Sequence, residues 1–408
     1  MPFSTKKRKD TLSASYSLTA LTWKKLKKNR MGMGCLFFLC ALVLLSLLGY
    51  LITPDHTPYC NEQLLEVRLL KPGSSVRMLS VRKNQHVEKK GPLKKMLFGQ
   101  PNPFTLVPIT SHHFSGDSLI VQLYNETAAL GRKSFHLADI AYPMDETSPP
   151  SKKGDTFLFT TIDHQRLQKK RAELMETVRS ECLSTKTYLL GTDRFGRDVL
   201  SQLIIGIRVS LSIGFISVCI ALLIGIFIGA AAGYFGGRTD DFLLWFINVV
   251  WSVPSLLLVI AISFVLGSGF WQVFIAIGLT MWVDIARVVR GQFISLREKE
   301  YVEASRSLGF KNFTIIFKHI LPNTIGTLTV ISASNFASAI LTEAGLSFLG
   351  IGVQPPMPSW GNMIKENYGY IILDYAYMAI VPGLAIVCLV LAFMLLGNAL
   401  RDVSDVRS

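Results

Sequence analysis

A polar segment at residues 301–323 carries the residues whose types and spacing point most directly to a function. Its sequence, YVEASRSLGFKNFTIIFKHILPN, lies between two long apolar runs. A short helix is predicted around Glu303, and Gly309 can end that helix because glycine adopts the left-handed cap conformation without strain. Asn312 is expected to cap a second helix, and Pro322 is expected to end it.

The second helix of this segment is predicted to have one apolar face. Its large apolar residues recur at i, i+3, i+4 and i+7, and they are Phe313, Ile316, Phe317 and Ile320. Two short helices that meet at a fixed angle, beside runs long enough to enter a membrane, indicate a part that transmits force to another protein.

Other residues that could do chemistry are sparse. The adjacent pair His112 and His113 does not converge on one point, and no nucleophile elbow, phosphate loop or zinc signature occurs in the sequence. We therefore predict no catalytic residue and no metal site. Cys60 and Cys182 lie near the two ends of a long loop, so they are candidates for a disulfide if that loop is outside the cytoplasm, and two free thiols are the alternative.

The composition is that of a membrane protein. The 408 residues are 50% hydrophobic and 17% charged, with a mean hydropathy of +0.38. The net charge is +14, and residues 1–31 supply a large share of it, with nine Lys or Arg and one Asp. A basic tail beside the first apolar run is typical of a cytoplasmic terminus, so no nucleic-acid partner is predicted.

Six apolar segments are long enough to cross a bilayer as helices. They are residues 32–52, 209–233, 242–266, 270–289, 324–344 and 376–399. The basic residues lie in the tail and in the loops around 236–241 and 287–318, whereas the loop 345–375 has only Lys365. Basic loops stay inside, so both termini and the segment 301–323 are predicted to be cytoplasmic.

Two features of these helices have structural interpretations. Asp284 is expected to pair with Arg287 near the cytoplasmic end of its helix, and Glu343 falls near the outer end of the fifth, so an interfacial role is favoured over an ion relay. The small residues Gly225, Gly229 and Gly233 allow close contact with another helix, which we expect to belong to a partner subunit.

Residues 53–185 differ from the rest of the chain. A strand–turn–strand unit is predicted over 66–81, further strands at 118–124 and 156–161, and one amphipathic helix over about 164–182. These elements are enough for a small α+β extracytoplasmic insert between the first and second helices.

Three motifs lie in the part of the sequence that follows the insert. The first contains Glu303, Ala304, Ser305, Gly309, Leu321 and Pro322. The second precedes the second membrane helix and contains Gly191, Thr192, Asp193, Gly196, Arg197 and Asp198. The third follows the fifth helix and contains Gln354, Pro355, Pro356, Trp360 and Gly361. The three motifs resemble those of ABC importer permeases of the dipeptide/oligopeptide (peptide/nickel/opine) family, in which the first is the EAA motif. The chain is most similar to the second, C-type permease, over about residues 186–402, and 232–237 fits the same group.

The resemblance implies a domain order and a fold. The order is a cytoplasmic tail 1–31, a helix 32–52, the insert 53–185, a permease domain 186–402 with its coupling segment 301–323, and a tail 403–408. The fold is all-α and polytopic, with the six transmembrane helices of a type I importer permease, in the inner (plasma) membrane.

The resemblance also implies partners and roles. A second permease subunit, a cytoplasmic ABC ATPase that binds ATP and Mg, and an extracytoplasmic substrate-binding protein would complete an importer of peptides. Glu303 would contact the ATPase, and Gly309 would provide the bend. The face that ties the segment to the membrane helices would be made of Phe313, Ile316 and Phe317. This chain would bind no cofactor and hydrolyse nothing.

The departures from the family pattern leave the cargo open. Ser305 replaces an Ala of the motif, and His319 stands where the general motif often has Ile, although the peptide branch commonly has His-Ile-Leu-Pro there. The long insert resembles the microcin-type branch, and nickel chelates, opines and antibiotic peptides remain alternatives to ordinary peptides. A secondary transporter or channel, a membrane-anchored enzyme and a structural assembly factor are the competing classes.

Overall fold

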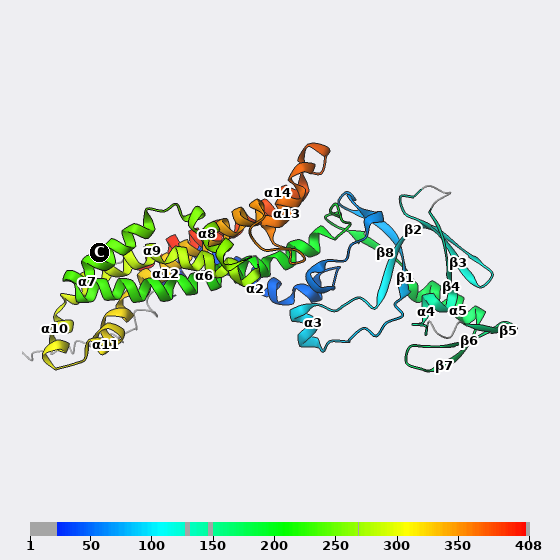
Figure 1. The fold of residues 1–408 in the computed structure, drawn as a ribbon, viewed down its shortest axis with the longest axis horizontal. Coiled ribbons are helices and arrows are strands. Elements are labelled where there is room, and N and C mark those ends of the chain that lie inside the picture. Colours follow the sequence, from blue (N-terminus) through cyan, green and yellow to red (C-terminus); the bar gives the residue numbers. More distant parts are fainter. Residues whose placement is uncertain (1–22, 127–130, 146–149, 268, 405–408) are drawn as a thin grey trace, which may run out of the picture.

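The computed structural model describes residues 23–126, 131–145, 150–267 and 269–404. They form an elongated molecule, with a bundle of long helices and a region rich in β-strands at one end (Figure 1). Residues 1–22 of the predicted basic tail and the last four residues of the chain lie outside the described residues. The division follows the sequence pattern, because the long apolar runs form helices and the more polar insert forms strands.

Five helical stretches are long and apolar enough to cross a membrane, judged by length and composition. They are α2 (Arg30–Ile52), α6 (Val199–Phe235), α9 (Phe270–Arg297), the stretch Asn312–Leu349 that ends in α12 (Leu321–Leu349), and α14 (Tyr377–Ser404). They coincide with five of the six predicted apolar runs, so the prediction of a helical, polytopic membrane fold is confirmed.

The sixth predicted run is not one continuous helix. It is divided into α7 (Gly237–Trp251) and α8 (Ser255–Leu266), which meet at an angle of 88°. Pro254 stands at the break, and the residue before a proline is pushed out of the helical conformation. The expected straight span over 242–266 is therefore wrong, and the pair makes either a broken span or a re-entrant loop.

The small-residue face of α6 packs inside the chain. A Cβ added at Gly225 would lie 2.8 Å from the carbonyl oxygen of Trp282, and one added at Gly233 would lie 2.6 Å from the carbonyl oxygen of Arg290. Both neighbours belong to α9, and Gly229 between them faces Ala286 and Val289 of the same helix. The expected contact with a partner subunit at this face is therefore wrong, because α9 already occupies it.

The insert contains two antiparallel sheets. The larger has the order β4-β3-β2-β1-β8, with β1 (Ser74–Arg82), β2 (Phe104–Ser115), β3 (Ser118–Leu123), β4 (Arg132–His136) and β8 (Leu183–Tyr188). The smaller has the order β5-β6-β7, with β5 (Ser151–Lys153), β6 (Thr156–Thr160) and β7 (Arg166–Lys170). The helices α3 (Pro92–Phe98), α4 (Leu137–Ala141) and α5 (Arg171–Thr177) complete it.

One core joins the two sheets. Leu79 and Leu119 of the larger sheet, Ile140 of α4, Phe157 of the smaller sheet and Leu174 of α5 are all buried in one cluster. The strands predicted at 118–124 and 156–161 are present, apart from their last residues. Two other predictions are wrong: residues 65–67 form a 3-10 turn instead of a strand, and the expected helix over 164–182 begins with β7 before α5 starts.

The coupling segment has the predicted first helix and a different second one. It comprises α10 (Glu300–Ser307), α11 (Asn312–Thr314) and a π-helical turn, η4 (Ile315–Ile320), which runs directly into α12. Pro322 does not end a helix but lies in the first turn of α12, where a proline needs no amide hydrogen. Lys311, rather than Asn312, occupies the cap position of α11.

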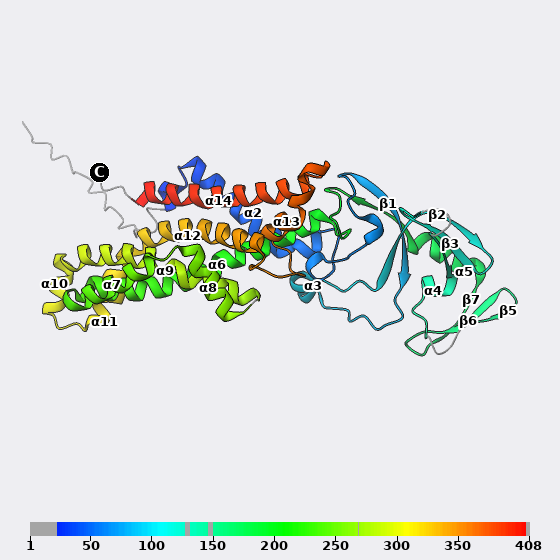
Figure 2. The same cartoon turned by 45° about the horizontal axis from the view of Figure 1, so that its top comes forward.

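Figure 2 shows the two ends of the bundle. The coupling segment lies at one end, and α13 (Trp360–Asn367) with the short turn η5 (Tyr368–Leu373) lies toward the other, beside the insert. The candidate functional residues therefore fall into two groups, one at each end of the membrane helices.

Candidate functional site

The first helix of the coupling segment has one buried and one exposed face. Val302 is fully buried and Ser305 nearly so, and the Ser305 hydroxyl donates to the carbonyl oxygen of Tyr301 at 2.7 Å. Glu303 and Ala304 point to the exposed side. Within the described residues, the Glu303 carboxylate has no hydrogen bond or ion pair, so it is available to a partner.

The bend of the segment is at Gly309, as the sequence predicts. Its φ of +78° is in the left-handed region, and the space where a Cβ would stand is open. Its amide donates to the carbonyl of Arg306 at 2.9 Å, and the amide of Phe310 donates to that of Ser305 at 3.2 Å. These bonds close the carboxyl end of α10 and fix the direction in which the chain leaves it.

The apolar face of the second helix is divided between packing and exposure. Ile315, Ile316 and Ile320 are buried in the membrane-domain core, whereas Phe313 is 70% exposed. The Phe313 ring lies 4.4 Å from the ring of Phe317. Ile316 and Phe317 of the expected tie pack against the membrane-domain core, whereas Phe313 is largely exposed and contacts the Phe317 ring.

The coupling segment is also fixed to the end of α6, which the sequence did not indicate. The Tyr234 hydroxyl donates to Oδ1 of Asn312 at 2.8 Å, and the Arg306 guanidinium lies 5.1 Å from the centre of the Tyr234 ring. A second tie nearby joins Arg290 of α9 to Asp240 of α7 at 2.5 and 2.7 Å. No local pattern links residues so far apart in the chain.

The coupling end presents a set of apolar side chains to its surroundings. They are exposed by 40 to 76%, and they are Tyr301, Leu308, Phe310 and Phe313. Leu321 is partly buried and Pro322 exposed where α12 begins. Four large apolar side chains around an unpaired carboxylate, held by a buried face, form a surface suited to another protein.

The other end is organised by Asp193. Its Oδ1 accepts hydrogen bonds from the amides of Phe195 and Arg197, both at 2.9 Å, and its Oδ2 accepts from the Arg197 guanidinium at 2.7 Å and from Gln202 at 3.3 Å. Asp198 then caps α6 by accepting from the Ser201 amide at 3.0 Å. One carboxylate therefore shapes the turn, and a second starts the membrane helix.

The same motif holds the insert to the membrane domain. The Thr192 hydroxyl accepts from the amide of Leu70 at 2.9 Å, and the Leu69 amide donates to the carbonyl of Asp193 at 3.1 Å. Gly191 and Gly196 have φ of +72° and +75°, and Gly196 presses against the carbonyl oxygen of Leu64. Side chains at these two glycines would collide with the insert backbone, so both are needed for the close approach.

The second and third signature motifs meet in space. Arg197 of the second motif bonds Asp193 and also Glu366 of α13, and the indole of Trp360 in the third motif donates to the carbonyl of Leu203 on α6 at 2.9 Å. Gly361 is buried against the backbone of Ala344 on α12. In the loop before α13, Gln354, Pro355 and Pro356 are exposed, and the two prolines line a small cleft with Arg197 and Glu366.

Two family models match the sequence. One, described as a binding-protein-dependent transport system inner membrane component, matches residues 221–407. The other, described as the N-terminal TM domain of oligopeptide transport permease C, matches residues 17–72. They leave out most of the insert, and both fall on membrane helices.

Curated relatives match the same part of the chain. A glutathione transport system permease protein, GsiD, of Pectobacterium atrosepticum is 39% identical over 54% of this chain and 73% of its own length. The oligopeptide permease OppC of Bacillus subtilis is 39% identical over 54% and 72%, and the dipeptide permease DppC of Alkalihalophilus pseudofirmus is 40% identical over 53% and 70%. The chain belongs to the permease family of binding-protein-dependent (ABC) importers. Within it, the chain falls in the C-type peptide-permease branch.

A solved structure, an inward-facing methionine ABC transporter, MetNI, aligns with 50% of this permease and 97% of its own chain, at 19% identity and a TM-score of 0.42. The chain's membership of the family is shown by the relatives of similar sequence and not by this structural likeness.

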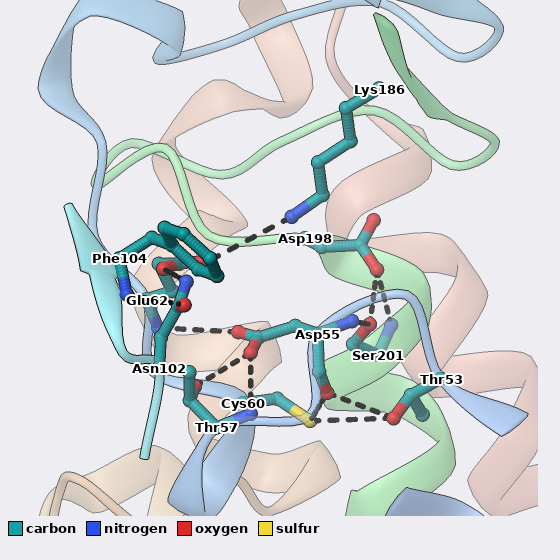
Figure 3. A network of polar contacts seen from close by, with 10 residues as sticks. All are labelled: Thr53, Asp55, Thr57, Cys60, Glu62, Asn102, Phe104, Lys186, Asp198 and Ser201. Carbon is teal, nitrogen blue, oxygen red and sulfur yellow. Dashed lines mark hydrogen bonds and ion pairs between the residues drawn. The ribbon is translucent and has the colours of Figure 1, made fainter. Parts of the chain in front are cut away.

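A network at the carboxyl end of α2 joins the permease helices to the insert, and Figure 3 shows it. Asp55 is its centre: its carboxylate accepts from the amide and hydroxyl of Thr57 at 2.8 and 2.6 Å and from the Glu62 amide at 3.2 Å. The Asp55 amide donates to the Ser201 hydroxyl on α6 at 3.0 Å, and that hydroxyl bonds Asp198. Burial raises the pKa of both Asp198 and Glu62.

The candidate disulfide is not formed. Cys60 and Cys182 are both free thiols and both are buried, but in different clusters. The Cys60 thiol donates to the carbonyl of Asp55 at 3.0 Å, whereas Cys182 lies in the insert core beside the carbonyl of Ile140. Burial raises the pKa of each thiol. From the sequence, the two cysteines are expected to be close because they lie near the two ends of the long loop. That expectation is wrong, because the insert folds between the two positions.

The ionisable groups of the permease helices have different partners from those expected. Arg287 donates to Asn248 at 2.8 Å and lies over the Trp251 ring instead of pairing with Asp284. Glu343 is buried and accepts from the Ser347 hydroxyl at 2.7 Å. This carboxylate therefore holds the carboxyl end of α12 near the third signature motif, which supports a structural role.

Proposed function

We propose that this permease is a subunit of an ATP-driven importer of peptides, and that its coupling segment receives the motion of a cytoplasmic ATPase. The observation that carries the proposal is the exposed surface around Glu303, where four large apolar side chains stand on a rigid, buried base. A surface with those properties needs a protein partner. The relatives are transport permeases of oligopeptides, dipeptides and glutathione, which supports the same function.

The proposed orientation follows the charges. The chain would lie in the inner membrane with the basic amino-terminal tail, the carboxyl terminus and the coupling segment in the cytoplasm. The insert, residues 53–185, would then be extracytoplasmic. The large separation of the coupling segment from the insert along the bundle supports this arrangement (Figures 1 and 2).

The partners follow from the same arrangement. A cytoplasmic ABC ATPase would bind ATP and Mg and would contact Glu303, while an extracytoplasmic binding protein would deliver the peptide. A second permease subunit would complete the pathway. The chain itself would bind no cofactor and would catalyse no reaction.

The mechanism that the geometry supports is transfer through a continuous lever. The turn η4 runs from the coupling segment into α12 with no loop between them, so a displacement of α10 and α11 is passed to the whole of α12. The far end of α12 meets the third signature motif through Glu343, Ser347 and Ser359. Closure of the ATPase would thus tilt α12 and change which side of the membrane the pathway opens to.

The cargo class rests on the relatives and not on a binding site in this chain. Peptides are proposed first, because the relatives carry oligopeptides, dipeptides and glutathione. Nickel chelates, opines and antibiotic peptides are the alternatives that the same mechanism would serve.

The test uses two variants in the assembled importer. Glu303→Lys reverses the unpaired charge, and Gly309→Val puts a β-branched residue at a φ of +78°. Both should abolish peptide uptake while ATP hydrolysis continues and the permease inserts normally. Glu176→Lys, an exposed charge on α5 in the insert, is the matched control and should transport like the wild type. Unchanged uptake in both variants would refute the coupling assignment.

A further inference from the structure

The short helix α3 leaves its apolar side chains exposed. Within the sequence PLKKMLF, Leu93 is 67% exposed, Phe98 is 62% exposed and Leu97 is 37% exposed. Three large apolar side chains gathered on one seven-residue helix are therefore not used by the packing of the insert. Figures 1 and 2 both place α3 beside the bundle, where the insert meets the membrane helices.

Arg208 fixes the position of α3. This guanidinium, on α6, donates to the carbonyls of Met96 and Leu97 at 3.2 and 2.5 Å, and also to the carbonyls of Ser46 and Leu47 on α2 at 2.6 to 3.2 Å. Its hydrogen bonds among the described residues all go to carbonyls, with no carboxylate partner, and its guanidinium also lies 5.2 Å from the centre of the Tyr50 ring. One charged side chain therefore ties the carboxyl end of α3 to the flank of α2.

This tie sets the depth of α3 relative to the bilayer. Ser46 lies six residues before Ile52, the last residue of α2, which is about 9 Å along a helix. Helix α2 has 23 residues and is about 34 Å long, only slightly more than the roughly 30 Å of a hydrocarbon core. The carboxyl end of α3 is therefore level with, or below, the polar boundary of the membrane.

The neighbouring surface of α2 is already suited to lipid. Leu44, Leu47 and Leu51 are each about half exposed along a helix that the composition assigns to the membrane. Because Arg208 donates to the carbonyls of both Leu47 and Leu97, the carboxyl end of α3 lies beside this face.

The charges around α3 match headgroups. Lys89 and Lys94 are exposed, and Lys90 and Lys95 are partly exposed, with Glu88 as the one acidic residue of the run 88–98. Lysines beside an apolar helix face can keep their amines at the phosphate level while their carbon chains lie against the apolar layer. A protein partner would have to cover both the lysines and a face at membrane depth.

We propose that α3 is an interfacial anchor, whose Leu93, Leu97 and Phe98 enter the lipid leaflet at the insert side of the bundle while its lysines meet the phosphates. Arg208 holds the anchor against α2, and the anchor holds the insert at a fixed height over the membrane. The role is independent of the ATPase contact at the other end.

A photo-crosslinking experiment tests this assignment. Benzoylphenylalanine replaces Phe98 in the full chain, co-expressed with its partners in its native membrane, and a second variant carries it at Leu158 on β6 in the distal sheet. After irradiation, mass spectrometry should find phospholipid adducts at position 98 and a much lower yield of them at position 158, because only a side chain that lies in the leaflet stays close to lipid. Adducts to another protein at position 98, or equal lipid yields at both positions, would overturn the proposal.

Discussion

The two ends of the membrane bundle hold their motif residues in opposite ways. At the insert end, Asp193 and Arg197 are buried, and their charges are satisfied within the chain. At the coupling end, Glu303 has no partner among the described residues, and Phe313 is 70% exposed. The difference teaches that a motif can mark a junction inside the fold or, as proposed for the coupling end, a surface for another subunit, and burial of its residues distinguishes the two.

The largest effect is expected at the insert end, from Arg197→Gln. Removal of the guanidinium leaves two partly or fully buried carboxylates, Asp193 and Glu366, without their cation. Loss of one member of a buried ion pair costs about 3–5 kcal/mol of folding free energy. Arg194→Gln is the control, because Arg194 is exposed in the same turn. Thermal unfolding in detergent should separate the two variants, and equal stability would mean that the buried network is not a junction.

The next prediction compares the stability cost of substituting two glycines that share a backbone conformation. Gly196 and Gly309 have φ of +75° and +78°, but a Cβ at Gly196 would collide with the carbonyl of Leu64, whereas the space at Gly309 is open. Gly309→Ala should cost about 1 kcal/mol from backbone strain alone. Gly196→Ala should cost roughly 1–3 kcal/mol more, because the insert must also move away. If the unfolding free energies of the two variants agreed within error, the distinction between the two ends of the bundle would be lost.

A third comparison, of similar size, separates two apolar residues of the coupling segment by their effect on stability. Ile320→Ala should cost about 2–4 kcal/mol because the side chain is fully buried, whereas Phe313→Ala should change stability by less than about 1 kcal/mol. Peptide uptake should nevertheless fall in Phe313→Ala. The comparison would fail if Phe313→Ala destabilised the permease as much as Ile320→Ala does.

The smallest effect concerns the two thiols of the insert region. Without reductant, Cys60 and Cys182 should each take up an alkylating reagent once the protein is denatured, and both should react slowly in the folded chain because they are buried. Peptide mapping by mass distinguishes two alkylated cysteines from a crosslinked pair. A disulfide found in the mature protein would show that the insert packs differently.

The sequence alone predicted those features that depend on local chemistry. The bend at Gly309, the apolar helices and the family motifs follow from residue types over a few positions. The motif contacts did not follow: the Arg197–Glu366 pair joins residues 169 apart, and Tyr234 bonds an Asn312 that is 78 residues away. Pairing of β1 with β8 across the insert likewise has no local signal.

Other expectations failed because one residue type has several uses. The glycines of α6 suit any close helix contact, and only the fold shows that α9 fills the space. Pro322 can stop a helix or start one, and the π-helical turn before it decides in favour of the start. Phe313 fits an apolar periodicity but lies where that face leaves the core.

The most direct test of the central claim asks what the coupling surface touches. Benzoylphenylalanine at position 313, in the full importer in its native membrane, should form a covalent adduct with the cytoplasmic ATPase, and Glu303→Lys in the same chain should reduce the yield of that adduct. An adduct only with lipid or with an extracytoplasmic protein would contradict the account, as would an ATPase adduct whose yield does not respond to Glu303→Lys.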